Sequence, residues 1–169
     1  MSKTEWKFED NSKAFLAQFK SCGLAFLEEA KSSLVSQTQR NTPGKPTGNL
    51  RRSFDDDSYV DEKNLAAYIG SSLKYAIYVE KGTGEYAIEG NGRKGYWVYV
   101  EGQESNKPPS KRKYTKQEAI ETVAYLRSKG LDAHYTCGQK PKLMLYNAYI
   151  QKKDKIARMA ADKFGGLGK

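Results

Sequence analysis

Residues 47–84 constrain the fold most, because segments of different hydrophobic period follow one another there between glycine and proline turns. Residues 50–54 (LRRSF) are basic and partly apolar, and they fit either a short helix or an extended segment. Residues 55–63 predict an exposed acidic loop or, if Tyr59 and Val60 pair, part of a strand. Residues 64–70 alternate and predict a strand, whereas residues 75–81 carry aromatic and aliphatic side chains at helical spacing and predict a short helix. We therefore expect a mixed unit with an aromatic surface and no catalytic signature.

Helical periodicity marks both ends of the chain. Near the N-terminus, steps of four, three, four and four residues separate Phe15, Phe19, Cys22, Phe26 and Ala30. This spacing predicts a helix that begins at a cap on Asn11 or Ser12 and ends near Gln39, with its aromatic face packed in the core. Residues 143–164 predict a last helix, with Pro141 placed at its start.

The clearest local signals flank a third helix. Thr115 and Glu118 have the spacing of a capping box, in which each residue satisfies a backbone N–H near the helix start. Gly130 followed by Leu131 is typical of a helix end. Together they predict a helix over about residues 116–129.

Short strands and long loops fill the remainder. Residues 132–137 predict one strand. Residues 96–100 predict another, whose two faces are both apolar or aromatic, so we expect burial on both sides, in the fold or in an assembly. Residues 82–95 hold five glycines and predict a flexible arm or a long hairpin loop, and residues 102–114 predict a basic loop that contains proline.

These elements indicate the α+β class, with long N- and C-terminal helices packed on an antiparallel β-sheet, one further helix and long loops. The length of 169 residues predicts one domain, over residues 1–164. Residues 165–169, which hold three glycines, are expected to form a disordered tail.

The composition leaves two interpretations open. The hydrophobic fraction is 38%, but the chain carries 12 Tyr, a residue enriched at protein interfaces. One interpretation is a subunit that buries further surface in an assembly. The other is a loop-rich monomer with ordinary surface tyrosines.

The net charge of +9 indicates affinity for polyanions. Basic residues gather in the loops near aromatic side chains, an arrangement that can contact phosphates and stack bases. The candidate contacts to DNA or an acidic partner are Arg93, Lys94, Lys107, Lys111, Arg112 and Lys113. No nucleic-acid-binding motif accompanies them, so the alternatives are non-specific binding and a solvated basic face.

No enzyme is visible in the sequence. The only histidine, His134, has no recognisable nucleophile or base motif near it and is expected to be structural. His134 and Cys137 would supply two metal ligands, and Cys22 is the only other soft ligand, so we expect no metal site. The glycine-rich turns match no phosphate-binding pattern, and we expect no cofactor.

The chain shows no secretory signal and no apolar stretch of membrane-spanning length. Its two cysteines have no metal-type spacing and are expected to be buried or free thiols in a reducing compartment. We therefore expect a soluble protein made inside the cell, without membrane contact.

Three segments, in order and spacing, resemble the HK97 gp10-like family of tailed-phage neck and tail-completion proteins. They are TGNLRRSF at 47–54, IGSSLKYAIYVEKGTG at 69–84 and GQKPK at 138–142. Residues 114–136 resemble an element of members from phages and prophages of Gram-positive hosts. The family pattern continues the third segment with PFL and PA, where this chain has LML and NA, so the resemblance departs where the last helix docks.

The resemblance implies a structural subunit without enzyme activity, found in the virion and assembled in the host cytoplasm. It implies a ring at the head–tail junction or tail end, expected to be hexameric in the particle, with the isolated subunit monomeric. Neck or connector proteins and tail-tube proteins are the expected partners, with non-specific DNA contact as a further possibility. The expected subunit interface comprises Arg51, Arg52, Tyr75, Tyr78, Glu80, Lys81, Thr83, Trp97 and Tyr99.

Overall fold

The computed structural model describes residues 10–44, 48–102 and 112–167. The chain folds into two compact units. The first unit combines Met1–Ser72 with Met144–Lys169, and the second is Leu73–Leu143. Each unit is built around its own helices and one antiparallel pair of strands.

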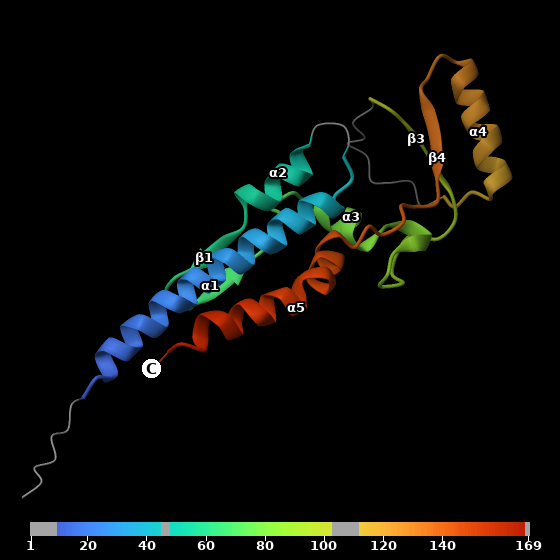
Figure 1. The fold of residues 1–169 in the computed structure, drawn as a ribbon. Helices are drawn as coiled ribbons and strands as arrows, with labels where there is room; N and C mark the ends of the chain where they lie inside the picture. Colours follow the sequence, from blue (N-terminus) through green and yellow to red (C-terminus); the bar gives the residue numbers. More distant parts are fainter. Residues whose placement is uncertain (1–9, 45–47, 103–111, 168–169) are drawn as a thin grey trace, which may run out of the picture. The chain divides into compact units, whose positions relative to one another are not determined.

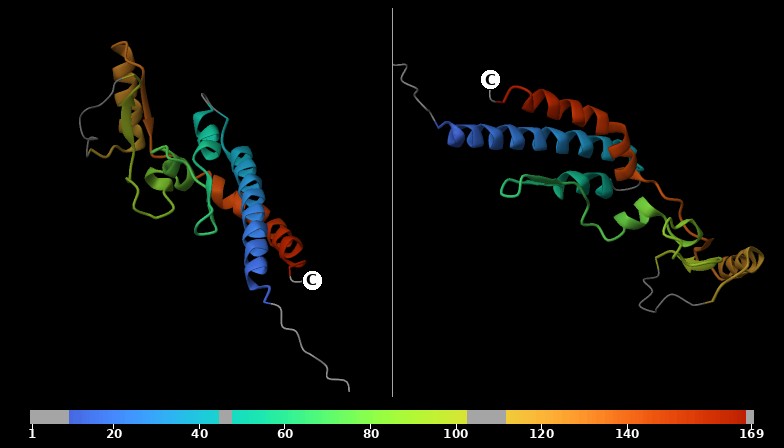
Figure 2. Two further views of the ribbon diagram at one scale, coloured as in Figure 1. Left: turned by 90° about the vertical axis from the view of Figure 1, so that its left-hand side faces the viewer. Right: turned by 90° about the horizontal axis from the view of Figure 1, so that it is seen from below.

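The first unit has three layers, with helix α1 (Ser12–Asn41) in the middle. On one side lies α5 (Met144–Phe164), and on the other lie α2 (Asn49–Asp56) and the hairpin of β1 (Tyr59–Asp61) and β2 (Ala66–Tyr68), as the right-hand view of Figure 2 shows. The N- and C-terminal helices therefore pack mainly on each other, and the hairpin covers the opposite face of α1.

The core of this unit combines a few large side chains with many small ones. The largest side chains that are fully buried are Phe54 of α2, Met144 of α5 and Thr38 of α1. The aromatic face predicted for α1 is only partly covered, because Phe15 and Phe19 remain 44% and 42% exposed. The predicted core packing therefore holds for part of this face, where Ala30 is buried, but not for its N-terminal end. The ring of Phe164 reaches Phe19 at 5.5 Å, whereas Phe15 lies nearer the free end of the helix.

The segment 50–54, compatible with helix or strand in the sequence, is helical, and it is tied to its surroundings by serine hydroxyls. Ser53 is buried, and its hydroxyl lies 2.6 Å from that of Ser71, just after β2. Ser58 donates to the carbonyl of Phe54 at 2.6 Å and accepts from the Gly70 N–H at 3.2 Å. These bonds fix the helix against both ends of the hairpin.

The second unit contains α3 (Ala76–Lys81), the short 3₁₀ helix η1 (Gly84–Tyr86), β3 (Trp97–Val100), α4 (Lys116–Ser128) and β4 (Ala133–Thr136), labelled in part in Figure 1. Strands β3 and β4 pair antiparallel, with Trp97 opposite Thr136 and Val100 opposite Ala133. Helix α4 packs on this strand pair.

Both predicted ends of α4 are confirmed. The Thr115 hydroxyl accepts from the Glu118 N–H, and the Glu118 carboxylate accepts from the Thr115 N–H at 2.7 Å. At the other end Gly130 has a φ of 78°, and the Leu131 N–H donates to the Leu126 carbonyl at 3.2 Å. This is the hydrogen bond that closes a helix at a glycine.

The two faces of the β3–β4 pair differ. Opposite residues of an antiparallel pair share a face, so Val98, Val100 and the buried Ala133 lie on one face. The other face carries Trp97, Tyr99 and His134, and Tyr99 is 48% exposed. Burial on both sides is therefore not reached within the chain, and only the assembly half of that expectation remains.

The α+β class and the long terminal helices are confirmed, with the antiparallel pairing divided between two two-stranded ladders. The last helix, α5, begins at Met144, within one residue of the predicted 143–164, but Pro141 does not lie at its start. The reason is that Lys142 and Leu143 donate their N–H groups to the carbonyls of Val79 and Glu80, and Leu143 adopts a left-handed φ of 51°.

The loop predictions are partly corrected. Residues 82–90 are not a free arm, because η1 and its turns hold them by hydrogen bonds such as Ile88 N–H to the Lys81 carbonyl, at 3.1 Å. Most of the 102–114 loop lies outside the described residues, but Tyr114 pairs with Tyr96 as an isolated bridge. Residues 165–167 continue α5 as a turn.

Candidate functional site

A hydrogen-bonded junction joins the GTG turn to the segment after β4. Thr83 donates its N–H to the Gln139 carbonyl at 2.9 Å, and its hydroxyl accepts from the Gln139 N–H at 2.9 Å. The Glu85 N–H donates to the Cys137 carbonyl at 2.9 Å. Two of the three segments that carried the family resemblance thus meet in one place, although 56 positions separate Thr83 from Gln139 along the chain.

Glycine is required at two points of this junction. Gly84 has a φ of 61°, and a Cβ there would overlap the carbonyl oxygen of Cys137. Gly138 has a φ of 128°, and a Cβ there would overlap the carbonyl oxygen of Thr83. The backbones touch because both residues lack side chains, so the junction positions α3 on one side and β4 on the other.

Helix α3 presents an exposed apolar surface immediately before the junction. Its one buried residue is Ala76, whereas Ile77 and Tyr78 are 54% and 58% exposed, and Tyr75, at its N-cap, is 45% exposed. Tyr86 and Ile88, which follow in and after η1, are also exposed. We call Tyr75, Ile77 and Tyr78 the α3 surface. A short helix that turns most of its large side chains outward is typical of a contact region rather than of a core element.

The other predicted interface residues occupy different settings. Arg51 and Arg52 belong to the first unit, where the Arg51 guanidinium donates to the Thr42 carbonyl at 3.1 Å. Arg51 also lines a shallow hollow with Ser36, Gln39 and Arg40. In the second unit, Lys81 is paired with Glu89, and Thr83 uses its hydroxyl within the junction.

Trp97 and Tyr99 lie on the open face of β3, where each stacks with a neighbouring polar side chain. The guanidinium of Arg93 lies 5.0 Å from the centre of the Trp97 ring. The ring of Tyr99 stacks on that of His134 at 5.5 Å. Both aromatic side chains are therefore held in place while keeping part of their surface open.

The structure brings together two of the predicted basic contacts, Arg93 and Arg112. The Arg93 guanidinium donates to the Arg112 carbonyl at 2.6 Å, and the Arg112 guanidinium lies 4.6 Å from the centre of the Tyr114 ring. Lys94 and Lys113 are exposed neighbours. Lys107 and Lys111 lie outside the described residues. We call Arg93, Trp97, Arg112 and Tyr114 the arginine–aromatic group.

Two tyrosines near the junction have raised pKa values. The Cys137 sulfur and the Tyr86 hydroxyl form a hydrogen bond at 3.8 Å, which is the main cause of the raised pKa of Tyr86. Burial is the main cause of the raised pKa of Tyr96. Both phenols thus stay protonated near neutral pH, and the junction gains no negative charge from them.

Sequence reasoning missed parts of these surfaces. Ile77 and Ile88 were not predicted as contacts, because an aliphatic residue in a short amphipathic segment is ordinarily assigned to the core. The neighbours of His134 were also missed: Asp132 and Glu101 lie within 2.9 and 3.5 Å of its Nε2 atom. The alternation of side chains along a strand could have predicted that Asp132 and His134 lie on the same face.

The described cysteines, Cys22 and Cys137, are both free thiols, as predicted. Within the described residues, no helix combines the length and the apolar character that crossing a membrane requires.

The chain thus has the form of an α+β protein whose main surface features are exposed aromatic and basic groups. A family model described as "Bacteriophage HK97-gp10, putative tail-component" matches residues 7–102, more than half of the chain. The chain belongs to this HK97-gp10-like family of phage tail components. The match includes the first two resembling segments, whereas the GQKPK segment lies beyond it. No curated protein and no solved structure matches the chain significantly.

Proposed function

We propose that this tail component is a structural subunit of the ring at the head–tail junction or tail end of a siphovirus-like phage or of a prophage in a Gram-positive host. Its partners are further copies of itself, in a hexameric ring, together with neck or connector proteins and the tail-tube protein. It acts in the virion after assembly in the host cytoplasm, and it catalyses no reaction. Family membership supports the tail assignment, and the surface of the second unit supports the assembly role.

The observation that carries the proposal is the α3 surface. Tyr75, Ile77 and Tyr78 project from a helix that the junction anchors at its C-terminal end, so their backbone positions are fixed before any partner arrives. Aromatic residues with fixed backbones provide large contact areas at low entropic cost, and they are enriched at protein interfaces. A contact made by this surface would also remove water from side chains that are more than two-fifths exposed in the free chain.

The test compares Tyr78→Ser with Tyr125→Ser. Tyr125 is a matched control because it is 62% exposed and lies on α4, away from the α3 residues in sequence and in element. We expect both variants to keep the melting temperature of the parent chain, since neither side chain is buried. Only Tyr78→Ser should reduce ring formation with the tail-tube protein, scored by electron microscopy, and the yield of infectious particles in a complementation assay.

Equal losses from both variants, or no loss from Tyr75→Ser and Tyr78→Ser together, would contradict the assignment of the interface to α3. A chain that joins no tail or neck structure, even at high concentration with its partners, would contradict the ring role itself.

A second candidate function, non-specific DNA binding, is favoured by the arginine–aromatic group. Two guanidinium groups and two aromatic rings are held together there, and this combination suits phosphate contact and base stacking. A ring subunit with this group facing the lumen would meet the passing genome.

The tryptophan of this group provides a direct probe. The chain has two tryptophans, so a Trp6→Phe background leaves Trp97 as the only one. Single-stranded DNA should quench its fluorescence, with an affinity that falls steeply with salt. Arg93→Ala with Arg112→Ala should abolish quenching, whereas Lys152→Ala with Lys153→Ala, an equal loss of charge on α5, should preserve it. Salt-independent binding, or equal effects of both pairs, would exclude this site.

A further inference from the structure

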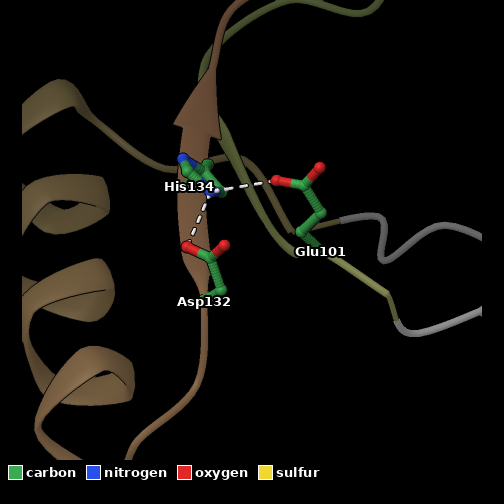
Figure 3. A group of neighbouring side chains, drawn as sticks. All are labelled: Glu101, Asp132 and His134. Atoms are coloured by element: carbon green, nitrogen blue, oxygen red, sulfur yellow. Dashed lines mark ion pairs between the residues drawn. The ribbon is translucent and has the colours of Figure 1, made fainter.

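We propose that Glu101, Asp132 and His134 form a binding site for one divalent transition-metal ion, of which Zn²⁺ is the probe of choice. Glu101 directly follows β3, Asp132 directly precedes β4 and His134 lies within β4 (Figure 3). One ligand atom from each residue lies within 4.8 Å of the other two. The site is independent of the proposed assembly role.

The strand pairing places the three side chains together. The Glu101 N–H donates to the Asp132 carbonyl at 2.8 Å, which extends the β3–β4 ladder past Val100 and Ala133. Asp132 and His134 are two residues apart on one strand and so project to the same side. The stack of His134 on Tyr99 at 5.5 Å then orients the imidazole. The three ligand residues are therefore brought together by backbone pairing of the strands and by the packing of the two rings.

The spacing of the ligand atoms fits a single small cation. His134 Nε2 lies 2.9 Å from Asp132 Oδ1 and 3.5 Å from Glu101 Oε2. Zinc bonds of about 2.0–2.2 Å to nitrogen and oxygen place neighbouring ligand atoms about 3–3.5 Å apart around the ion. Both measured separations fall close to this interval, and the two carboxylates are exposed enough to rotate into place.

A second observation concerns the Nε2 atom itself. It is buried from solvent, and it is the one buried side-chain nitrogen or oxygen without a hydrogen-bond partner among the described residues. Asp132 Oδ1 lies 2.9 Å away as an ion-pair contact, and the structure shows no hydrogen bond to this nitrogen. A buried polar atom without a partner is costly, and a metal ion in front of the imidazole lone pair would satisfy it.

The donor set indicates the class of metal. One imidazole nitrogen with two carboxylate oxygens suits zinc and similar first-row ions, whereas Mg²⁺ and Ca²⁺ favour oxygen ligands alone. The ion would neutralise the paired carboxylates and link the end of β3 to the start of β4. Three protein ligands also leave a fourth position of a tetrahedral site for water or for a group from another chain.

The single histidine makes the test direct. Imidazole nitrogen NMR of the full chain, prepared without a histidine tag, reports only on His134. We expect one equivalent of Zn²⁺ to shift the Nε2 resonance and to raise the melting temperature, with no such effect from Mg²⁺. Glu101→Gln and Asp132→Asn should each weaken zinc affinity about tenfold or more, by calorimetry, since each removes one of three ligands.

His134→Phe keeps an aromatic ring to stack on Tyr99 but removes both nitrogens, and it should abolish the stoichiometric site. Glu62→Gln is the matched control: it removes one exposed acidic charge in the first unit and should leave zinc affinity unchanged. Cobalt(II) distinguishes the proposed site from binding by the cysteines, because binding through Cys22 or Cys137 would produce a thiolate charge-transfer band.

An Nε2 resonance that zinc does not move would overturn the proposal. Zinc affinity that survives both Glu101→Gln and Asp132→Asn, or a thiolate band with cobalt, would likewise assign the metal to other groups. In either case the three residues are an ion-pair cluster only.

Discussion

At the residue scale, the junction between the GTG turn and the segment after β4 depends on glycines that have no substitute. Gly84 and Gly90 have similar φ angles, 61° and 70°, but only Gly84 faces another backbone within 4 Å. An alanine at Gly90 would therefore incur only the strain of a left-handed φ, whereas an alanine at Gly84 would also overlap another backbone. A turn glycine is tolerant of substitution only when the space beside it is open.

We expect Gly84→Ala to lower the free energy of unfolding by about 2–4 kcal/mol, because conformational strain and overlap with Cys137 add. Gly90→Ala should cost only about 1 kcal/mol, from strain alone. Urea denaturation measures both values. Equal losses would mean that the backbone at residue 84 relaxes and that the close approach is not required.

At the element scale, α4 owes its start to the Thr115–Glu118 capping box. The hydrogen bonds from Thr115, that of its backbone N–H first, lower the pKa of Glu118 below its ordinary value of 4.5. Since the folded pKa is the lower one, the carboxylate stabilises the fold above the ordinary value, and this contribution disappears as the pH falls through the lowered pKa.

Replacement of the cap should show both effects. Thr115→Ala should destabilise the protein by about 1 kcal/mol at neutral pH, the usual cost of a lost N-cap. Glu118→Gln should melt below the parent chain at pH 7, and the difference should shrink as the pH falls below the ordinary value of 4.5 and through the lowered pKa, followed by circular dichroism. A difference that persists in acid would show that the carboxylate charge is not what stabilises the cap.

The pairing of α1 with α5 is uneven along its length, and substitutions should reveal this. Met144→Ala removes a fully buried side chain and should cost about 2–5 kcal/mol. Phe164→Ala removes a larger but half-buried side chain that contacts Phe19 and Phe26, and should cost only about 1 kcal/mol. Guanidinium titrations measure the loss of unfolding free energy in each variant. A larger loss for Phe164→Ala would mean that the aromatic contacts at the end of α5 contribute more to the pairing of the two helices.

At the scale of the whole molecule, the sequence predicts one domain over residues 1–164, whereas the folded chain forms two compact units. The cores of the two units use different residues: Phe54 and Met144 in the first, Ala119, Val123 and Ala133 in the second. Separate cores permit the units to open independently.

Hydrogen exchange of the Met144→Ala variant tests this independence. Amides of α1 and α5 should exchange faster than in the parent chain, whereas amides of α4 and β4 should keep their protection. Thr115→Ala is the reciprocal change and should affect α4 and β4 only. Uniform loss of protection from either variant would instead support the single cooperative domain.

Local signals in the sequence were sufficient for the elements with strong local causes. The capping box and Gly130 bound α4, the apolar spacing predicted α1 and α5, and strand patterns predicted β2, β3 and β4, because these signals act between residues a few positions apart. Strand β1 was only an alternative to an acidic loop, because it depends on pairing with β2. Helical spacing of Tyr75, Tyr78 and Val79 also predicted α3, although not that its large side chains face outward.

The meeting of distant residues, by contrast, depends on the folded arrangement. Pro141 lies outside α5 because Lys142 and Leu143 hydrogen-bond to α3, more than 60 positions earlier in the chain. The same holds for Gly84 against Cys137, for Arg93 beside Arg112, and for Glu101 beside His134. Hydrophobic period and turn chemistry carry no information on such pairs, since their proximity follows from how whole elements pack and which backbones can approach closely.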